Sequence, residues 1–271
     1  MLLICCKVTT NLLEINVYCD LPNYILYEVD SCDSTQDAIV DLLGQHFGDM
    51  HRLFGIFTAN QLSGKGQRGK TWYSNKGESL ALTLALPIKS WMEQDLVLLN
   101  KSISVILCNN ISRFINQPIR LKWPNDIVVA DKKLGGILLH THSSNVGKWL
   151  IFGLGLNVGK IPKEVENTAI CLKDCCDHPP SIPVIAEQLL RDLSVFVKGT
   201  SSWMPSNFDS QYTEKLWKIN SEVVIYFYVN EQLTKTELRT LIGVDAQGRI
   251  MLQSSTGHTD VFHHGEVRIA Y

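Results

Sequence analysis

Residues 120–139 read RLKWPNDIVVADKKLGGILL, and this stretch decides which fold we expect. Apolar runs on either side of Pro124-Asn125-Asp126 predict short strands, and a polar turn leads into another strand. Lys122 lies near the end of the first of these strands and is followed at once by Trp123 and Pro124. A stiff apolar pair is not needed for solubility, so we interpret Lys122 as functional rather than as half of an ion pair at a strand end. The predicted strands are 119–123, 127–130 and 134–140.

A glycine-rich segment lies upstream, where residues 64–74 read GKGQRGKTWYS. Three glycines alternate with Lys65, Arg68 and Lys70. Glycine permits positive φ and close approach of the backbone, while cations and exposed amides together form a nest for an anion. We therefore predict a phosphate-holding loop.

The same letters satisfy the P-loop pattern G-x-x-x-x-G-K-[ST], through Gly64, Gly69, Lys70 and Thr71. A P-loop opens a helix whose N-terminal amides face the phosphates. Residues 74–78 instead read SNKGE, which is typical of a turn, and alternating leucines then predict a strand over 79–86. A P-loop NTPase is therefore a third-ranked alternative, and it would turn over ATP without an organic acid.

Four motifs in this order resemble those of the biotin protein ligases (biotin–acetyl-CoA-carboxylase ligases). That family carries G-[RK]-G-x-x-G, K-W-P-N-D, K-x-x-G-[IV]-L and G-x-G-x-N. One such motif is weak, but four in register are specific. The resemblance covers roughly residues 24–160 by motif and the remainder by layout. The matching segments are 64–69, 122–126, 133–138 and 153–157.

The resemblance implies an α+β fold. Residues 1–217 are expected to form a mixed sheet flanked by helices, like the class II synthetases, and residues 218–271 a small SH3-like β-barrel. Strand patterns after 217, with a hairpin turn at residues 245–248, agree with the barrel. Residues 1–23 are too short for the DNA-binding domain that some of these ligases carry, so we expect an enzyme only.

The remaining elements follow from periodicity, because alternation predicts strands and spacings of three and four predict helices. Ser31 or Ser34 can begin the first helix. The predicted strands are 24–29, 53–59, 149–156, 222–229, 234–244, 248–254 and 259–269. The predicted helices run from the first helix start to about 47, and over 96–115, 181–198 and 208–217, with a long loop at 160–181.

The resemblance also implies the reaction. The biotin carboxylate attacks the α-phosphate of ATP to give biotinyl-5′-AMP and pyrophosphate, and a lysine of an acceptor protein then displaces AMP. Both steps move negative charge onto oxygen, so placed cations and donors are needed. We expect Lys122, Lys65 and Arg68 to be catalytic, with Lys122 contacting both carboxyl and α-phosphate. ATP and Mg2+ are the expected cofactors, and Asp126 is a metal ligand or, equally, a buried structural carboxylate.

The biotin-binding residues are assigned by position. The family has a Ser-Thr pair followed by Asn, where this chain has Ser34, Thr35 and Gln36. From the residues alone, this pair is a plain helix start. Gln61 is a solvated loop residue or a ligand of the ureido ring, and its amide has the donor and acceptor which that ring needs. The implied set is Ser34, Thr35, Gln36, Gln61, Lys65, Gly66, Gln67, Lys122 and Gly136.

The adenylate-binding residues come from the same motifs. The family usually has arginine where this chain has Gln67, and we expect the adjacent Arg68 to supply that charge. Trp72 is the expected stacking face. We also expect the loop to be mobile without ligand and to become ordered over the intermediate. The implied set is Lys65, Arg68, Lys70, Trp72, Lys122, Asn125, Lys133 and Asn157.

Composition sets further limits. The chain has 271 residues, 45% of them hydrophobic and 19% charged, which is typical of a globular protein. A net charge of −2 provides no overall basic field, so we expect neither a nucleic-acid nor a membrane partner. Residues 1–6 are too short for a signal segment, and no apolar run approaches ~18 residues, so we expect the cytoplasm. The eight cysteines are then expected to be reduced thiols.

Two clusters could suggest a metal. His140 and His142 share one face of a predicted strand, but two ligands without a third favour surface histidines. Cys171, Cys175, Cys176 and His178 fit no zinc spacing, so we interpret them as structural or incidental.

Two other functions stay open beside the ligase. A lipoate or octanoate protein ligase has similar chemistry, although K-W-P-N-D favours biotin. A non-catalytic biotin or nucleotide sensor is the second, with Gln36 and Gln67 as marks of decay. For the ligase, the resemblance implies a biotin carboxyl carrier domain as acceptor, docked by strand addition; a homodimer stays open.

Overall fold

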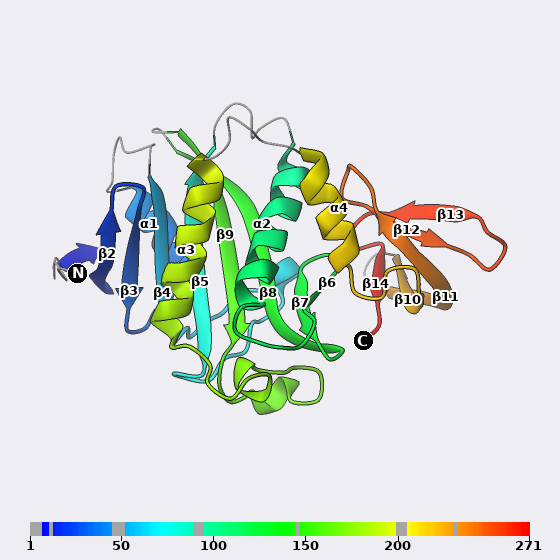
Figure 1. Cartoon of the computed structure of the whole chain (residues 1–271), viewed down its shortest axis with the longest axis horizontal. Coiled ribbons are helices and arrows are strands. Elements are labelled where there is room, and N and C mark those ends of the chain that lie inside the picture. Colours follow the sequence, from blue (N-terminus) through cyan, green and yellow to red (C-terminus); the bar gives the residue numbers. More distant parts are fainter. Residues whose placement is uncertain are drawn as a thin grey trace.

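The computed structural model describes residues 7–10, 13–44, 52–88, 95–144, 147–198, 205–229 and 232–271. Within these residues the chain forms a nine-stranded sheet and a separate five-stranded sheet, which lie side by side (Figure 1). Among the described residues no helix is long and apolar enough to cross a membrane.

The large sheet has the strand order β1-β2-β3-β4-β5-β9-β8-β7-β6. β3 and β4 are parallel and are joined through helix α1, whereas the other neighbouring strands are antiparallel. The sheet is therefore mixed, as predicted. The strands are β1 Lys7–Thr10, β2 Leu13–Leu21, β3 Tyr24–Val29, β4 Leu53–Thr58, β5 Ser79–Pro87, β6 Arg120–Lys122, β7 Asp126–Val129, β8 Lys132–Ser144 and β9 Gly147–Asn157.

Helices cover both faces of this sheet (Figure 1). Helix α1, Thr35–Leu43, packs on one face with an apolar cluster that includes Ile56 and Trp149. Helices α2, Leu96–Ile111, and α3, Ile182–Lys198, pack on the other face, and α4, Pro205–Lys215, lies against α2.

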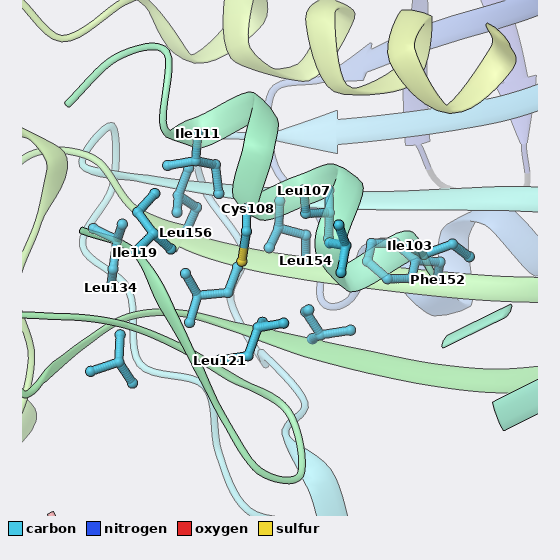
Figure 2. Close-up of a cluster of buried hydrophobic side chains, with 14 of the residues drawn as sticks. Ile103, Leu107, Cys108, Ile111, Ile119, Leu121, Leu134, Phe152, Leu154 and Leu156 are labelled. Atoms are coloured by element: carbon cyan, nitrogen blue, oxygen red, sulfur yellow. The ribbon is translucent and has the colours of Figure 1, made fainter. Parts of the chain in front are cut away.

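Side-chain size differs between the two faces. In β5, Leu80, Leu82 and Leu84 are fully buried on the α2 and α3 face, where Figure 2 shows Leu107 and Ile111 of α2 above β9. The alternate residues of β5, Ala81 and Thr83, face the other way. In β9 the matching pattern places Leu154 and Leu156 in the core and glycines on the opposite face. Small residues therefore leave space on one face beside α1.

The small sheet is antiparallel, with the order β13-β12-β11-β10-β14. In the part of the chain that the structure describes, no ladder of hydrogen bonds joins β13 to β14. The predicted turn at residues 245–248 is confirmed by the hydrogen bond from the Gly248 amide to Asp245. The boundary between 217 and 218 stays a prediction. The strands are β10 Glu222–Val229, β11 Gln232–Val244, β12 Ile250–Gln253, β13 Thr259–Phe262 and β14 Val267–Ile269.

Several predicted elements differ from the structure in their bounds. The strand expected over 259–269 is split into β13 and β14, because residues 263–266 turn and Gly265 has φ +103. Helix α2 ends at Ile111 and is followed by a turn, so it is shorter than the predicted 96–115. The predicted end of the first helix near 47 lies outside the described residues. Strands β1 and β2 were not predicted.

The two sheets are joined beside Lys122. The indole nitrogen of Trp123 donates a hydrogen bond to the carbonyl of Gly248 at 3.0 Å. The buried ammonium of Lys101 donates to the carbonyls of Val244 and Asp245 at 3.2 and 3.0 Å and pairs with Asp209 at 2.5 Å. Trp123 therefore connects the two sheets, and this role could not be predicted from the residues around it in the sequence.

Candidate active site

A cavity of about 670 Å³ lies on the small-residue face of the large sheet. Its walls come from the start of α1, the glycine-rich loop, the 122–126 segment and the strand β14 region. All the residues singled out from the sequence line it except Asn157. The lining residues from that set are Ser34, Thr35, Gln36, Gln61, Lys65, Gly66, Gln67, Arg68, Lys70, Trp72, Lys122, Asn125, Asp126, Lys133 and Gly136.

Glycines form the floor because side chains rest directly on them. A Cβ built on Gly155 would lie 2.5 Å from the Trp72 indole, and one on Gly153 would lie 2.5 Å from the Gln36 amide nitrogen. A Cβ on Gly136 would lie 3.4 Å from the same indole. The glycines of G-x-G-x-N therefore make room for Trp72 and Gln36.

A chain of hydrogen bonds fixes one end of the cavity. Thr83 donates its hydroxyl hydrogen to the Thr35 hydroxyl at 2.8 Å, and the Thr35 hydroxyl and amide donate to the side-chain oxygen of Gln61 at 3.2 and 2.9 Å. The Gln61 oxygen is thereby held in place. Thr83 was not singled out from the sequence, since a threonine in an alternating strand gives no signal.

Three buried polar atoms in the cavity have no partner within the described residues: the hydroxyl of Ser34, the amide oxygen of Gln67 and the indole nitrogen of Trp72. Ser34 is the N-cap of α1, yet its side chain makes no capping hydrogen bond, contrary to the plain helix start. Because buried polar groups are nearly always hydrogen-bonded, these atoms indicate a polar ligand. Gln36 instead donates to the Leu138 carbonyl at 3.2 Å.

The glycine-rich loop folds back on itself beside the small sheet. The Gly66 amide donates to the Lys70 carbonyl at 2.6 Å, and the Trp72 amide to the Gly64 carbonyl at 2.9 Å. Arg68 has φ 54 and donates to the His264 carbonyl at 3.1 Å, with its guanidinium over Gly265. Arg68 is therefore held by the small sheet at the cavity wall.

Lys65 pairs with a carboxylate of α1. Its ammonium lies 2.6 Å from Asp37, and both side chains are more than half exposed, so this pair contributes little stability. The cation is available at the mouth of the cavity for a bound anion.

Lys122 is the most deeply placed cation of the cavity, with 5% of its surface exposed. It alternates with Leu121, which points into the core, so Lys122 faces the cavity. Burial lowers the pKa of its ammonium to about 7, against an opposing effect of Asp126, and the positive charges of Arg268, Lys133 and Lys70 lower it further. The ammonium lies 3.2 Å from the centre of the Tyr271 ring and 5.5 Å from that of Trp217.

Asp126 is the only carboxylate among the described cavity residues. One oxygen pairs with Lys133 at 2.6 Å and the other accepts a hydrogen bond from the Tyr271 hydroxyl at 2.7 Å. No group of three or more metal-binding side chains occurs in the described chain. Magnesium needs only one or two carboxylates when phosphates complete its coordination, so an ion could be held mainly by ATP. A ligand role for Asp126 stays a prediction.

The two asparagines have structural bonds. Asn125 donates its side-chain amide to the Ile137 carbonyl at 2.7 Å, which fixes the segment after Lys122. Asn157 is buried and donates to the carbonyls of Lys133 and Ile170 at 3.3 and 3.1 Å. Asn157 therefore supports the backbone of Lys133 from outside the cavity.

The cysteine cluster is internally bonded. The thiol of Cys171 donates to Asp174, and those of Cys175 and Cys176 donate to backbone carbonyls. Burial raises the pKa of Cys171 and of Cys175 to about 11, which keeps both as thiols. The bonds of these thiols agree with a structural role for the cysteine cluster.

His140 lies close to His142 on strand β8. Burial lowers the pKa of the His140 imidazole, and the neighbouring His142 lowers it further.

Residues 29–157 match the family described as the Biotin/lipoate A/B protein ligase family. A biotin–[acetyl-CoA-carboxylase] ligase of Mycobacterium tuberculosis is 25% identical over 217 residues, which cover 78% of this chain and 77% of that protein. A human biotin–protein ligase is 30% identical over 124 residues, 44% of this chain but 16% of the human one.

The fold is that of solved biotin protein ligases. The Aquifex aeolicus enzyme, determined in complex with biotin and ATP, superposes with a TM-score of 0.69 at 21% identity, over 92% of this chain and 99% of that one. At this identity the likeness establishes the fold.

Proposed function

We infer that this protein is a biotin–[acetyl-CoA-carboxylase] ligase, because residues 29–157 match the Biotin/lipoate A/B protein ligase family and a ligase of that name is 25% identical over 77% of its own length. It uses ATP to form biotinyl-5′-AMP and then attaches biotin to a lysine of a biotin carboxyl carrier domain. The observation that carries this function is the convergence of Lys122, the glycine-rich loop and the Thr35–Gln61 pair on one cavity.

In the first step a carboxylate oxygen of biotin forms a bond to the α-phosphorus, and pyrophosphate leaves with the bonding electrons. Carboxylate and triphosphate repel each other, so the step needs cations between them. Lys122 is the buried cation of the cavity, with Lys70 and Lys133 on the same wall. Lys122 contacts both the carboxylate and the α-phosphate, and Lys65 and Arg68 neutralise the phosphates at the loop.

Biotin and nucleotide occupy opposite ends of the cavity. Gln61, Ser34 and Thr35 bind the ureido ring, since the fixed Gln61 amide and the unpartnered Ser34 hydroxyl offer hydrogen bonds there. The nucleotide lies along Trp72, whose indole rests on Gly155. In the second step the acceptor amine attacks the acyl carbon, an amide forms, AMP leaves, and the amine loses a proton.

The acceptor is a carrier domain, and no nucleic-acid or membrane partner is proposed, because the net charge of −2 provides no basic field. A homodimer is compatible with this function. We place the protein in the cytoplasm, which the unpaired thiols of the described cysteines support.

The test is pyrophosphate release by the purified protein with ATP and, in turn, biotin, lipoate and octanoate. With ATP present, we expect pyrophosphate release with biotin but not with lipoate or octanoate, followed by labelling of a carrier domain. Release with lipoate or octanoate but not with biotin would identify a lipoate-type ligase. Biotin binding without release or labelling would identify a sensor.

A further inference from the structure

The side chain of Tyr271 lies between three charged groups of the cavity. Its ring centre is 3.2 Å from the ammonium of Lys122, and its hydroxyl donates to Asp126 at 2.7 Å. Asp126 in turn pairs with Lys133 at 2.6 Å. Tyr271 comes from the segment after β14, so the small sheet delivers it into a site built by the large sheet.

Lys122 has an unusual environment for a buried lysine. Its side chain is 5% exposed, and its ammonium lies over the ring of Tyr271. A desolvated ammonium must be compensated, and the face of an aromatic ring provides that compensation through its negative quadrupole. The Tyr271 ring is the partner in contact with it, since the Trp217 ring lies at 5.5 Å.

We propose that Tyr271 is a positioning residue for the adenylation step: its ring holds the Lys122 ammonium in place and charged until the carboxylate and α-phosphate arrive. The hydroxyl bond to Asp126 orients the ring over the ammonium. This inference rests on the proposed ligase function and adds a residue that the four motifs do not contain.

Several other charged groups face Lys122 and are part of the same balance. They come from β7, β8, β14 and the glycine-rich loop, and only one of them is negative. Loss of the ring therefore leaves the ammonium among mostly positive neighbours, and its charged form is then destabilised. These groups are Asp126, Lys133, Arg268 and Lys70.

The test compares Tyr271→Phe, which keeps the ring, with Tyr271→Leu, which keeps apolar bulk without a ring. Tyr226→Leu is the control, because Tyr226 lies in β10 of the same sheet and does not line the cavity. The titration of Lys122 is followed by carbon-13 NMR with lysine labelled at Cε, and assigned with Lys122→Met. The rate of adenylation is followed as pyrophosphate release over a range of pH.

We expect Lys122 to titrate at lower pH in Tyr271→Leu and at the wild-type pH in Tyr226→Leu. Tyr271→Phe should lie between them, because it keeps the ring but loses the bond to Asp126. Adenylation by Tyr271→Leu should fall about tenfold at pH 8 and recover as pH is lowered. A uniform loss at all pH values, or a Lys122 pKa that rises toward the ordinary lysine value, would overturn the proposal. The NMR titration needs no turnover, so a wild-type protein without pyrophosphate release would refute the proposed function and leave this test intact.

Discussion

The indole nitrogen of Trp123 donates a hydrogen bond to the carbonyl of Gly248, and this single bond joins the residue after Lys122 to the β11–β12 turn of the small sheet. The same sheet carries Tyr271 onto Lys122 and His264 onto Arg68. The small sheet is therefore part of the site rather than an appendage.

Trp123→Phe tests this connection. The ring stays buried, but the Gly248 carbonyl loses its partner, which should reduce the free energy of unfolding by about 1 kcal/mol. Adenylation should also slow, because the segment bearing Tyr271 is less firmly placed. Thermal unfolding and pyrophosphate release measure the two effects. Reduced stability with unchanged kcat would show that the bond supports the fold alone.

Thr83→Val removes the hydroxyl that donates to Thr35 at 2.8 Å while keeping the side-chain shape. The Thr35 hydroxyl then loses the donor that orients it, and its own bond to the Gln61 oxygen is held less firmly. We therefore expect the KM for biotin to rise about tenfold and the KM for ATP to stay unchanged. Thr141→Val, on an exposed part of β8, is the matched control. Equal changes in both KM values would contradict a role confined to the biotin end.

Gly155→Ala tests the seat of Trp72, since the added methyl would lie 2.5 Å from the indole. Displacement of the ring should weaken ATP binding by tenfold or more, a value on the order of one stacking contact, and leave biotin binding nearly intact. Gly44→Ala, where the nearest atom is 3.4 Å away, serves as control. Calorimetric titration with each ligand measures both, and unchanged ATP affinity would show that Trp72 does not meet the nucleotide.

The pH dependence follows from Lys122. Burial lowers its pKa to about 7 from an ordinary 10.5. In the free protein the Lys122 side chain therefore loses its proton and its positive charge as pH rises through neutrality. We expect kcat/KM for biotin to fall on the alkaline side of about 7, whereas the limb in kcat should lie higher because bound anions favour the charged lysine. Lys132→Met should show the same alkaline fall in kcat/KM as the wild-type protein. A wild-type kcat/KM that stays flat to pH 9 would contradict the assignment of this fall to Lys122.

The glycine-rich loop provides a prediction from sequence that remains to be tested. Fixing three glycines is entropically unfavourable, so the loop should become ordered over the adenylate. Protease cleavage within 62–72 should therefore slow with biotin and ATP, measured by mass spectrometry of the fragments. Equal cleavage rates with and without both ligands would show that the bonds of Gly66 and Trp72 already fix the loop.

Much of the large sheet could be predicted because its strands alternate. β3 and β5 were predicted at nearly their observed bounds, since buried strands alternate leucine with small residues or end at clear turns. β2 could not be predicted, as its register shifts between Val17 and Cys19, which breaks the period of two. The last predicted strand failed at Gly265, whose positive φ makes a turn inside an apolar pattern.

Site residues could be predicted where a sequence motif marks them, but not where only tertiary contacts bring a residue into the cavity. Lys122, Gln61 and Trp72 carry motif signals and do line one cavity. Arg68 could not be placed, because its contact with His264 depends on how the small sheet lies. Thr83 and Tyr271 could not be found either, since a threonine in a strand and a tyrosine after one are ordinary in sequence.

The most direct test of the central claim is the formation of biotinyl-AMP from radioactive biotin and ATP by the wild-type protein, Lys122→Met and Lys132→Met, with folding checked by circular dichroism. Lys132 is exposed, directly precedes Lys133 in β8 and should be dispensable. We predict that Lys122→Met stays folded and forms the adenylate at least about a hundredfold more slowly. A folded Lys122→Met protein that forms biotinyl-AMP at the wild-type rate would contradict the account.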